Sequence, residues 1–248
     1  MNNPPLISYI VPARNEEEFI GNCIASLKKQ ELEDNFEILV VDNASNDNTA
    51  MVATQLGARV IKEKTPGLSY TRSKGLNSAN GEIIIFVDAD TILPKNWSKT
   101  VVGYIKKSKN VVAVSCGFVF HDGRFYENLG CYFILLINPI YNITLQLFGK
   151  PNLLLGQSFA IKKSALVHAG GVNMDFPFYA EDIAMAKRLS SEGEVRYLYS
   201  ILARSSARRF HKIGFFRTLY LYMTPMILLM LGKYDRAKNF ASKHDYTK

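Results

Sequence analysis

Hydrophobic and polar positions alternate in blocks along the first 90 residues. Short apolar runs rich in β-branched residues, which are typical of strands buried on both faces, occur at 6–11, 36–41, 58–61 and 83–88. Segments with apolar residues at helical spacing lie between them, at 17–30, 49–56 and 67–80. Strands that alternate with helices form right-handed βαβ units. The fold class predicted is therefore α/β, with a mainly parallel central sheet flanked by helices.

The second half of the chain continues this pattern less regularly. It predicts helices at 96–109 and 181–193, and strands at 111–120, 156–161 and 195–200. The turns Gly-x-Gly-x-x-Gly and Gly-x-x-x-x-Gly-Lys-Ser/Thr do not occur in the first third. Their absence argues against a dinucleotide-binding Rossmann domain and excludes a P-loop.

Two acids follow the most apolar of the predicted strands. Asp88 and Asp90 come directly after Ile-Ile-Ile-Phe-Val at 83–87. Ligands of open α/β sheets bind beyond the carboxyl ends of the strands, and residues two apart in an extended chain point the same way. Paired carboxylates there suit Mg²⁺ or Mn²⁺ together with a diphosphate. The structural alternative is that Asp88 caps a turn and Asp90 begins a helix.

Two further residues point to the same edge of the sheet. Asp42 also ends a predicted strand, where an acid can accept hydrogen bonds from a ribose or a base. Arg72 lies on the predicted helix that leads into the central strand. It can neutralise a phosphate or pair with an acid, or lie exposed on the helix surface.

The charge of the chain is unevenly distributed. The 248 residues carry 30 Lys and Arg against 22 Asp and Glu, a net charge of +8. Residues 204–248 hold 10 of the basic and 2 of the acidic residues, so the whole excess lies there. Such a segment favours phosphates. Nucleic acid is the disfavoured partner, because the charges are interleaved with an apolar segment and no nucleic-acid-binding motif occurs.

Two apolar segments indicate a membrane surface as a partner. Residues 128–149 are uncharged, but Asn138, Pro139, Asn142 and Gln146 interrupt the run. They predict either a pair of interfacial helices or a buried helical hairpin, not a membrane span. Residues 215–231 predict an amphipathic helix that lies on the membrane surface or packs back on the domain. Residues 233–248 are expected to form a loose basic tail.

The cysteines and the N-terminus bear on location. Cys23, Cys116 and Cys131 are odd in number and lie in no metal-binding spacing, which indicates a reducing compartment. The first residues contain prolines and no secretory signal. We therefore expect a cytoplasmic protein, peripheral on the inner face of the cell membrane.

Several segments together resemble the family 2 glycosyltransferases, an inverting family with the GT-A fold. They are Pro12-Ala13-Arg14-Asn15-Glu16, Val40-Val41-Asp42-Asn43-Ala44-Ser45, Thr71-Arg72-Ser73-Lys74-Gly75 and Asp88-Ala89-Asp90. The resemblance covers residues 6–92 closely. It implies transfer of a sugar from a UDP- or GDP-sugar to an acceptor hydroxyl or phosphate, in lipid-linked or cell-surface glycan synthesis. It also implies that the strand at 111–120 pairs antiparallel at the edge of the sheet.

The resemblance assigns roles to individual residues. It implies that Asp42 holds the base and Asp90 the divalent metal, Mn²⁺ or Mg²⁺. His211 is a further candidate metal ligand, with a structural role as the alternative. Asp182 would be the catalytic base, because inverting transfer needs a carboxylate to take the acceptor's proton. The structural alternative is that Glu181 and Asp182 are favoured at this position by the dipole of a helix N-terminus. The remaining donor-site residues would be Ala13, Arg14, Glu16, Arg72, Asp88, Arg208 and Arg209, and the acceptor-site residues Gly156, Gln157 and Glu181.

The sequence also departs from the family. Processive members carry Gln-x-x-Arg-Trp where this chain has Ser206 and Phe210, which argues against polymer synthesis. The domains expected are a glycosyltransferase domain at 1–212, with a nucleotide half at 1–92 and an acceptor half at 93–212, and a membrane-associating segment at 213–248. The rival functions are a haloacid-dehalogenase-like phosphatase with Asp88 as nucleophile and a non-catalytic membrane-surface binding module.

Overall fold

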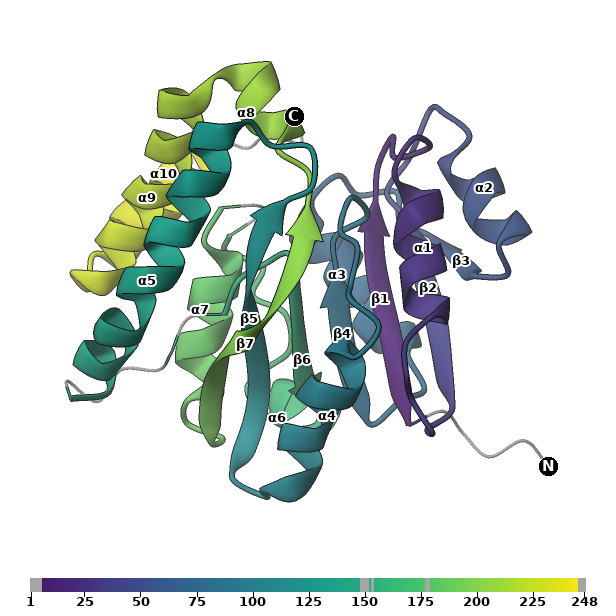
Figure 1. The fold of residues 1–248 in the computed structure, drawn as a ribbon, viewed down its shortest axis with the longest axis horizontal. Coiled ribbons are helices and arrows are strands. Elements are labelled where there is room, and N and C mark those ends of the chain that lie inside the picture. Colours follow the sequence, from purple (N-terminus) through teal and green to yellow (C-terminus); the bar gives the residue numbers. More distant parts are fainter. Residues whose placement is uncertain (1–5, 148–151, 153, 177–178, 245–248) are drawn as a thin grey trace.

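One mixed sheet of seven strands forms the centre of the protein, in the order β3-β2-β1-β4-β6-β5-β7 (Figure 1). The computed structural model describes residues 6–147, 152, 154–176 and 179–244. The strands are β1 (Ile7–Ala13), β2 (Phe36–Asp42), β3 (Arg59–Lys62), β4 (Ile83–Val87), β5 (Val111–Phe120), β6 (Ser158–Lys162) and β7 (Glu194–Ser205). Every residue of β4 is buried, as its continuous apolar run predicts.

The direction of the strands brings distant parts of the chain to one edge of the sheet. β1 pairs parallel with β2 and β4, and β2 pairs parallel with β3. β6 runs antiparallel to both β4 and β5. Val87, the last residue of β4, is therefore paired with Ser158, the first residue of β6. The segment before β6 lies beside the acids that follow β4.

The prediction that the strand at 111–120 forms the sheet edge is wrong. β5 is antiparallel to β6 as expected, but β7 pairs parallel with its other side and forms the edge. β7 also extends five residues beyond the predicted end at 200. The register shifts between Cys116 and Gly117, whose partners are Leu198 and Leu202. This irregularity interrupts the alternation of inward- and outward-facing side chains, from which the end of a strand is inferred.

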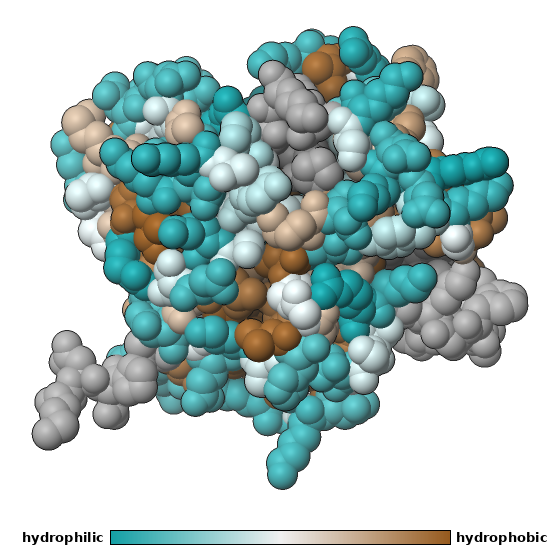
Figure 2. Space-filling view, turned by 180° about the vertical axis from the view of Figure 1, so that it is seen from behind, coloured by the Kyte–Doolittle hydropathy of each residue, from teal (hydrophilic) through white to brown (hydrophobic). Residues whose placement is uncertain are grey.

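Helices cover both faces of the sheet. They are α1 (Ile20–Lys28), α2 (Thr49–Gln55), α3 (Leu68–Ser78), α4 (Trp97–Lys107), α5 (Phe125–Leu147), α6 (Lys163–His168), α7 (Glu181–Leu189), α8 (Arg208–Ile213), α9 (Phe215–Met230) and α10 (Tyr234–Lys243). α1, α2 and α4 share one apolar core with the sheet, and α3, α6 and α7 share the other. The surface seen from behind is largely hydrophilic, with apolar residues gathered near its middle (Figure 2).

The C-terminal helices differ from the expectation in two respects. Residues 125–147 form the single helix α5, with Pro139 inside it, and not a pair of helices or a hairpin; positions 148 and 149 lie outside the described residues. The basic tail is a helix as far as Lys243, because Ala237 and Ala241 are spaced by one helical turn and are buried against α9 and its neighbours. None of the helices in the described part of the chain is long and apolar enough to span a membrane.

Candidate functional site

Asp88 and Asp90 lie in the tight turn that follows β4. The Asp88 amide donates to the Gln157 carbonyl at 3.0 Å, and the Thr91 amide donates to the Asp88 carbonyl at 3.0 Å. The Asp88 side chain is 36% exposed and that of Asp90 is 13% exposed. Burial raises the pKa of Asp88 to about 6, although Arg72 opposes this shift. Both acids thus lie at the carboxyl edge of the sheet, as predicted.

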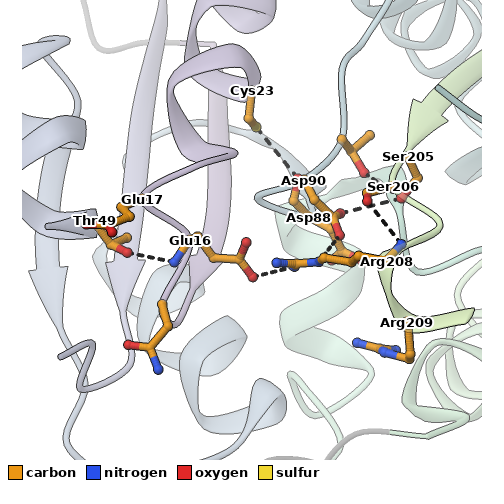
Figure 3. Close-up of polar contacts among 12 residues, drawn as sticks. Glu16, Glu17, Cys23, Thr49, Asp88, Asp90, Ser205, Ser206, Arg208 and Arg209 are labelled. Carbon is orange, nitrogen blue, oxygen red and sulfur yellow. Dashed lines mark hydrogen bonds and ion pairs between the residues drawn. The ribbon is translucent and has the colours of Figure 1, made fainter. Parts of the chain in front are cut away.

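Arg208 joins Asp90 to the loop after β1. Its Nε donates to Asp90 Oδ2 at 3.0 Å and its Nη2 donates to Glu16 Oε1 at 2.5 Å (Figure 3). Burial raises the pKa of Glu16 to about 7, against the opposing effect of Arg208. Asp90 Oδ1 lies 3.4 Å from the Ser205 hydroxyl, which donates to it. Two acids and one arginine from three separate segments therefore form one ionic cluster.

Arg72, on α3, contacts Asp88 directly. Its side chain is fully buried, and its Nη2 donates to Asp88 Oδ1 at 3.1 Å and to the Gly156 carbonyl at 2.8 Å. Its Nη1 forms an ion pair with Glu181 Oε1. The guanidinium also lies over the rings of Phe86 and Phe159, at 5.4 and 5.2 Å. In this position Arg72 organises the acids, and contact with a donor diphosphate would require it to move.

Asp182 is the second residue of α7 and lies next to Gly156. A Cβ added at Gly156 would lie 3.1 Å from Asp182 Oδ2, so the backbone approaches the carboxylate closely. The Ile183 amide donates to Asp182 Oδ1 at 2.9 Å. Burial raises the pKa of Asp182 above its usual range, and Arg72 opposes the shift. The group is a carboxylate of increased basicity that is still partly exposed.

The remaining donor-site candidates follow β1 and β2. Ala13 and Asp42, which end these two strands, are paired in the sheet and are buried. Asp42 Oδ1 accepts from the Ser45 amide at 3.3 Å. Arg14 is exposed. Asn43 braces the neighbouring loop by donating to the carbonyls of Glu63 and Thr65.

Two other candidates have different contacts. His211 lies on α8 with its Nε2 3.1 Å from Glu127 Oε2, a buried carboxylate of α5. The Arg209 guanidinium lies 5.6 Å from the centre of the Tyr222 ring and donates to the Tyr222 hydroxyl. The role of His211 as a metal ligand stays a prediction.

The sequence interpretation did not identify Asp122, Glu127 or Ser205 as parts of this region. Asp122 accepts from the Ser206 hydroxyl at 2.5 Å and from the Ala207 amide at 2.6 Å, and so anchors the start of α8. Its partners lie 84 and 85 residues away in the sequence. No local signal marks such residues, because their function depends on which segments the fold brings together.

The site also bears on whether a divalent ion fits. No cluster of three or more His, Cys, Asp or Glu suited to a metal occurs among the described residues. The carboxylates of Asp90 and Glu16 are nevertheless hard oxygen donors, and both face the position that the Arg208 guanidinium occupies. Glu16 Oε2 is buried and has no hydrogen-bond partner within the described segments. These residues fit a divalent ion that takes its other ligands from a bound diphosphate.

The arrangement of the strands and helices matches that of known glycosyltransferase structures. A mannosyltransferase from Pyrobaculum calidifontis, solved with GDP-Man and Mn²⁺, has a TM-score of 0.72 and 21% identity, with 94% of this chain and 65% of that chain covered. Glucosyl-3-phosphoglycerate synthase from Mycobacterium tuberculosis, solved with Mn²⁺, UDP-Glc and phosphoglyceric acid, has a TM-score of 0.58 and 23% identity, with 85% and 75% covered. The fold is that of the GT-A glycosyltransferases.

The sequence comparison assigns the family. The model of "Glycosyl transferase family 2" matches residues 8–168. An "Uncharacterized glycosyltransferase" from Haemophilus influenzae is 27% identical over 217 residues, which are 78% of this chain and 62% of that protein. The chain belongs to glycosyl transferase family 2, and this assignment disfavours the phosphatase that Asp88 and Asp90 also suggested. It spans between 33% and 62% of the length of the first curated relatives that it matches.

Proposed function

We propose that the protein transfers a sugar from a UDP- or GDP-sugar to an acceptor hydroxyl with inversion at the anomeric carbon. The observation that carries this proposal is the position of the Gly156 peptide. A Cβ added to this residue would lie 3.1 Å from Asp182 Oδ2, and its carbonyl accepts from Arg72, which also donates to Asp88. The Gly156 peptide thus connects the candidate base, Asp182, with Asp88 at the carboxyl edge of the sheet.

The proposed step is a single displacement. Asp182 takes the proton of the acceptor hydroxyl while the acceptor oxygen forms a bond to the anomeric carbon. The bond from that carbon to the diphosphate oxygen breaks, and the diphosphate leaves with its electron pair. The raised pKa of Asp182 makes its carboxylate a stronger base than an exposed aspartate. Arg208 and Arg209 offset the charge of the leaving group in this proposal.

A divalent ion belongs to the same proposal. Asp90 and Glu16 would hold it together with the donor, as the fit of their oxygen atoms suggests. The ion supplies positive charge to the diphosphate when it is bound. Asp42 would contact the base from the end of β2, as the family resemblance implies. The neighbouring structures that contain Mn²⁺ with a nucleotide sugar support this assignment.

We also propose a lipid-linked or cell-surface glycan acceptor presented at the inner face of the cell membrane. α5 exposes a stripe of large apolar side chains at helical spacing, formed by Phe125, Leu129, Tyr132, Phe133, Leu136 and Ile140. α9 adds Phe216, Leu219, Tyr220 and Ile227. Exposed basic residues lie at the ends of these helices, at Arg124, Lys212 and Lys233. Apolar and basic residues together suit an anionic membrane surface.

Vesicle binding tests the membrane part of the proposal. Leu136→Glu introduces a charge into the α5 stripe, and Leu136 is 74% exposed, so the fold should tolerate it. We expect wild type to sediment with anionic vesicles and Leu136→Glu to remain largely in solution. Met51→Glu on α2, where Met51 is 51% exposed, is the matched control. Equal sedimentation of all three proteins would contradict the membrane assignment.

Nucleotide binding tests the donor site. We expect the melting temperature to rise by about 2–4 °C for each kcal/mol of binding when UDP or GDP is added with Mn²⁺. The rise should be lost in Asp90→Ala and kept in Asp235→Ala, which removes an exposed acid of α10. The nucleotide that gives the larger rise names the donor. The absence of any rise with either nucleotide would refute the proposed donor site.

A further inference from the structure

The Arg208 guanidinium occupies the position between two carboxylates that a divalent ion also fits. It donates to Asp90 Oδ2 at 3.0 Å and to Glu16 Oε1 at 2.5 Å. Figure 3 shows the side chain extended from the start of α8 towards both acids. The ring of Phe19 lies 4.6 Å from the centre of the guanidinium. This one side chain therefore neutralises two largely buried acids that would otherwise repel each other.

An ion that approached these carboxylates would meet the guanidinium first. Asp90 has one oxygen on Arg208 and the other near the Ser205 hydroxyl. Glu16 has one oxygen on Arg208, and the other is buried with no hydrogen-bond partner in the described part of the chain. A dication and a guanidinium cannot occupy the same position, because their charges repel at contact distance. One of the two cations has to leave.

We propose that Arg208 is the internal counter-ion of Glu16 and Asp90 and that the divalent ion binds by displacing it. This inference rests on the proposed donor site and adds an order of binding to it. A displaced guanidinium needs a new anion, and a diphosphate supplies one. The metal and the nucleotide therefore bind cooperatively, and the metal alone binds weakly. The metal takes the place of Arg208 beside Glu16 and Asp90, and Arg208 moves to the diphosphate. The two acids therefore have a counter-ion both before and after the metal binds.

The start of α8 allows this exchange without unfolding. Asp122 holds the Ser206 hydroxyl and the Ala207 amide, and neither contact involves the Arg208 side chain. The Arg208 amide donates to the Ser206 hydroxyl at 3.1 Å. The backbone is therefore anchored independently, and the side chain can change rotamer while α8 stays in place. For the same reason Arg208→Ala should fold.

Titration with Mn²⁺, followed by the paramagnetic resonance signal of the free ion, tests the proposal on the intact chain. Without nucleotide, Arg208→Ala should bind Mn²⁺ at least about tenfold more tightly than wild type, because the fraction of molecules competent to bind rises. With UDP or GDP present the difference should shrink, since the nucleotide already draws Arg208 away in wild type. The cooperativity between metal and nucleotide is then smaller in the variant.

Arg217→Ala is the matched control, because it removes the same charge from an exposed residue of α9 that has no place in the proposed donor site. We expect it to change the affinity for Mn²⁺ alone less than about threefold, since an exposed charge without a direct contact to the acids has little effect. Equal tightening in Arg208→Ala and Arg217→Ala would overturn the exchange, and so would unchanged or weaker binding in Arg208→Ala. Failure of wild type to bind Mn²⁺ even with nucleotide would instead refute the proposed donor site itself.

Discussion

Arg72 donates a hydrogen bond to Asp88 across 3.1 Å from a side chain that has no contact with solvent. The same guanidinium pairs with Glu181 and lies over two phenylalanine rings. Removing one partner of a buried ion pair leaves an uncompensated charge and is strongly destabilising. Arg72 therefore fixes the acid at the donor edge relative to the helix that carries the candidate base.

Loss of Arg72 should destabilise the protein strongly. Arg72→Ala leaves the Glu181 carboxylate buried without its partner, and we expect the free energy of unfolding to fall by about 3–5 kcal/mol. Urea denaturation measures this change. The double variant Arg72→Met with Glu181→Leu removes both charges and should be less destabilised than the single one. A loss below about 1 kcal/mol in Arg72→Ala would show that the pair is not a structural element.

Asp182→Asn should raise stability at neutral pH. Folding raises the pKa of Asp182, so the folded state holds its proton more tightly than the unfolded state. The stabilisation from this group is complete below the unfolded pKa and is lost as the pH rises through the folded pKa. A neutral amide avoids that loss. We expect a higher melting temperature than wild type at pH 7 and a smaller difference at pH 4.

The same substitution should slow turnover strongly while donor binding persists. Removing a general base costs about 10²–10⁴-fold in rate, and the nucleotide with Mn²⁺ should still raise the melting temperature of Asp182→Asn. Unchanged turnover would rule out Asp182 as the base. In wild type, the raised pKa of Asp182 predicts that activity falls on the acid side at a pH above the usual aspartate range.

Gly156→Ala should impair catalysis through the position of Asp182. The added methyl would lie 3.1 Å from Asp182 Oδ2, so the carboxylate has to shift. We expect kcat to fall roughly tenfold to a hundredfold with little change in the donor KM. Gly103→Ala is the control, because no atom lies within 4 Å of its added Cβ on α4. It should stabilise the helix by about 1 kcal/mol and leave kcat unchanged. Equal kcat values in both variants would contradict the positioning role.

Some elements were predictable and others were not, for identifiable physical reasons. The buried strand β4 and the acids after it follow from a local run of residue types. The prediction that β5 forms the edge of the sheet was wrong, because strand order depends on the pairing of β5 with β7, about 80 residues away in sequence. The single helix α5 was missed, since Pro139 and the asparagines resemble a break when only local propensity is considered.

The sequence by itself determined the α/β class, the acids at the strand ends and the family resemblance, because side-chain periodicity and short motifs are local properties of the chain. Only the tertiary structure decided that Arg72 is buried and that Arg208 meets Glu16, 192 residues earlier in the chain. Such contacts depend on how distant segments pack around a shared core. No local pattern records that packing.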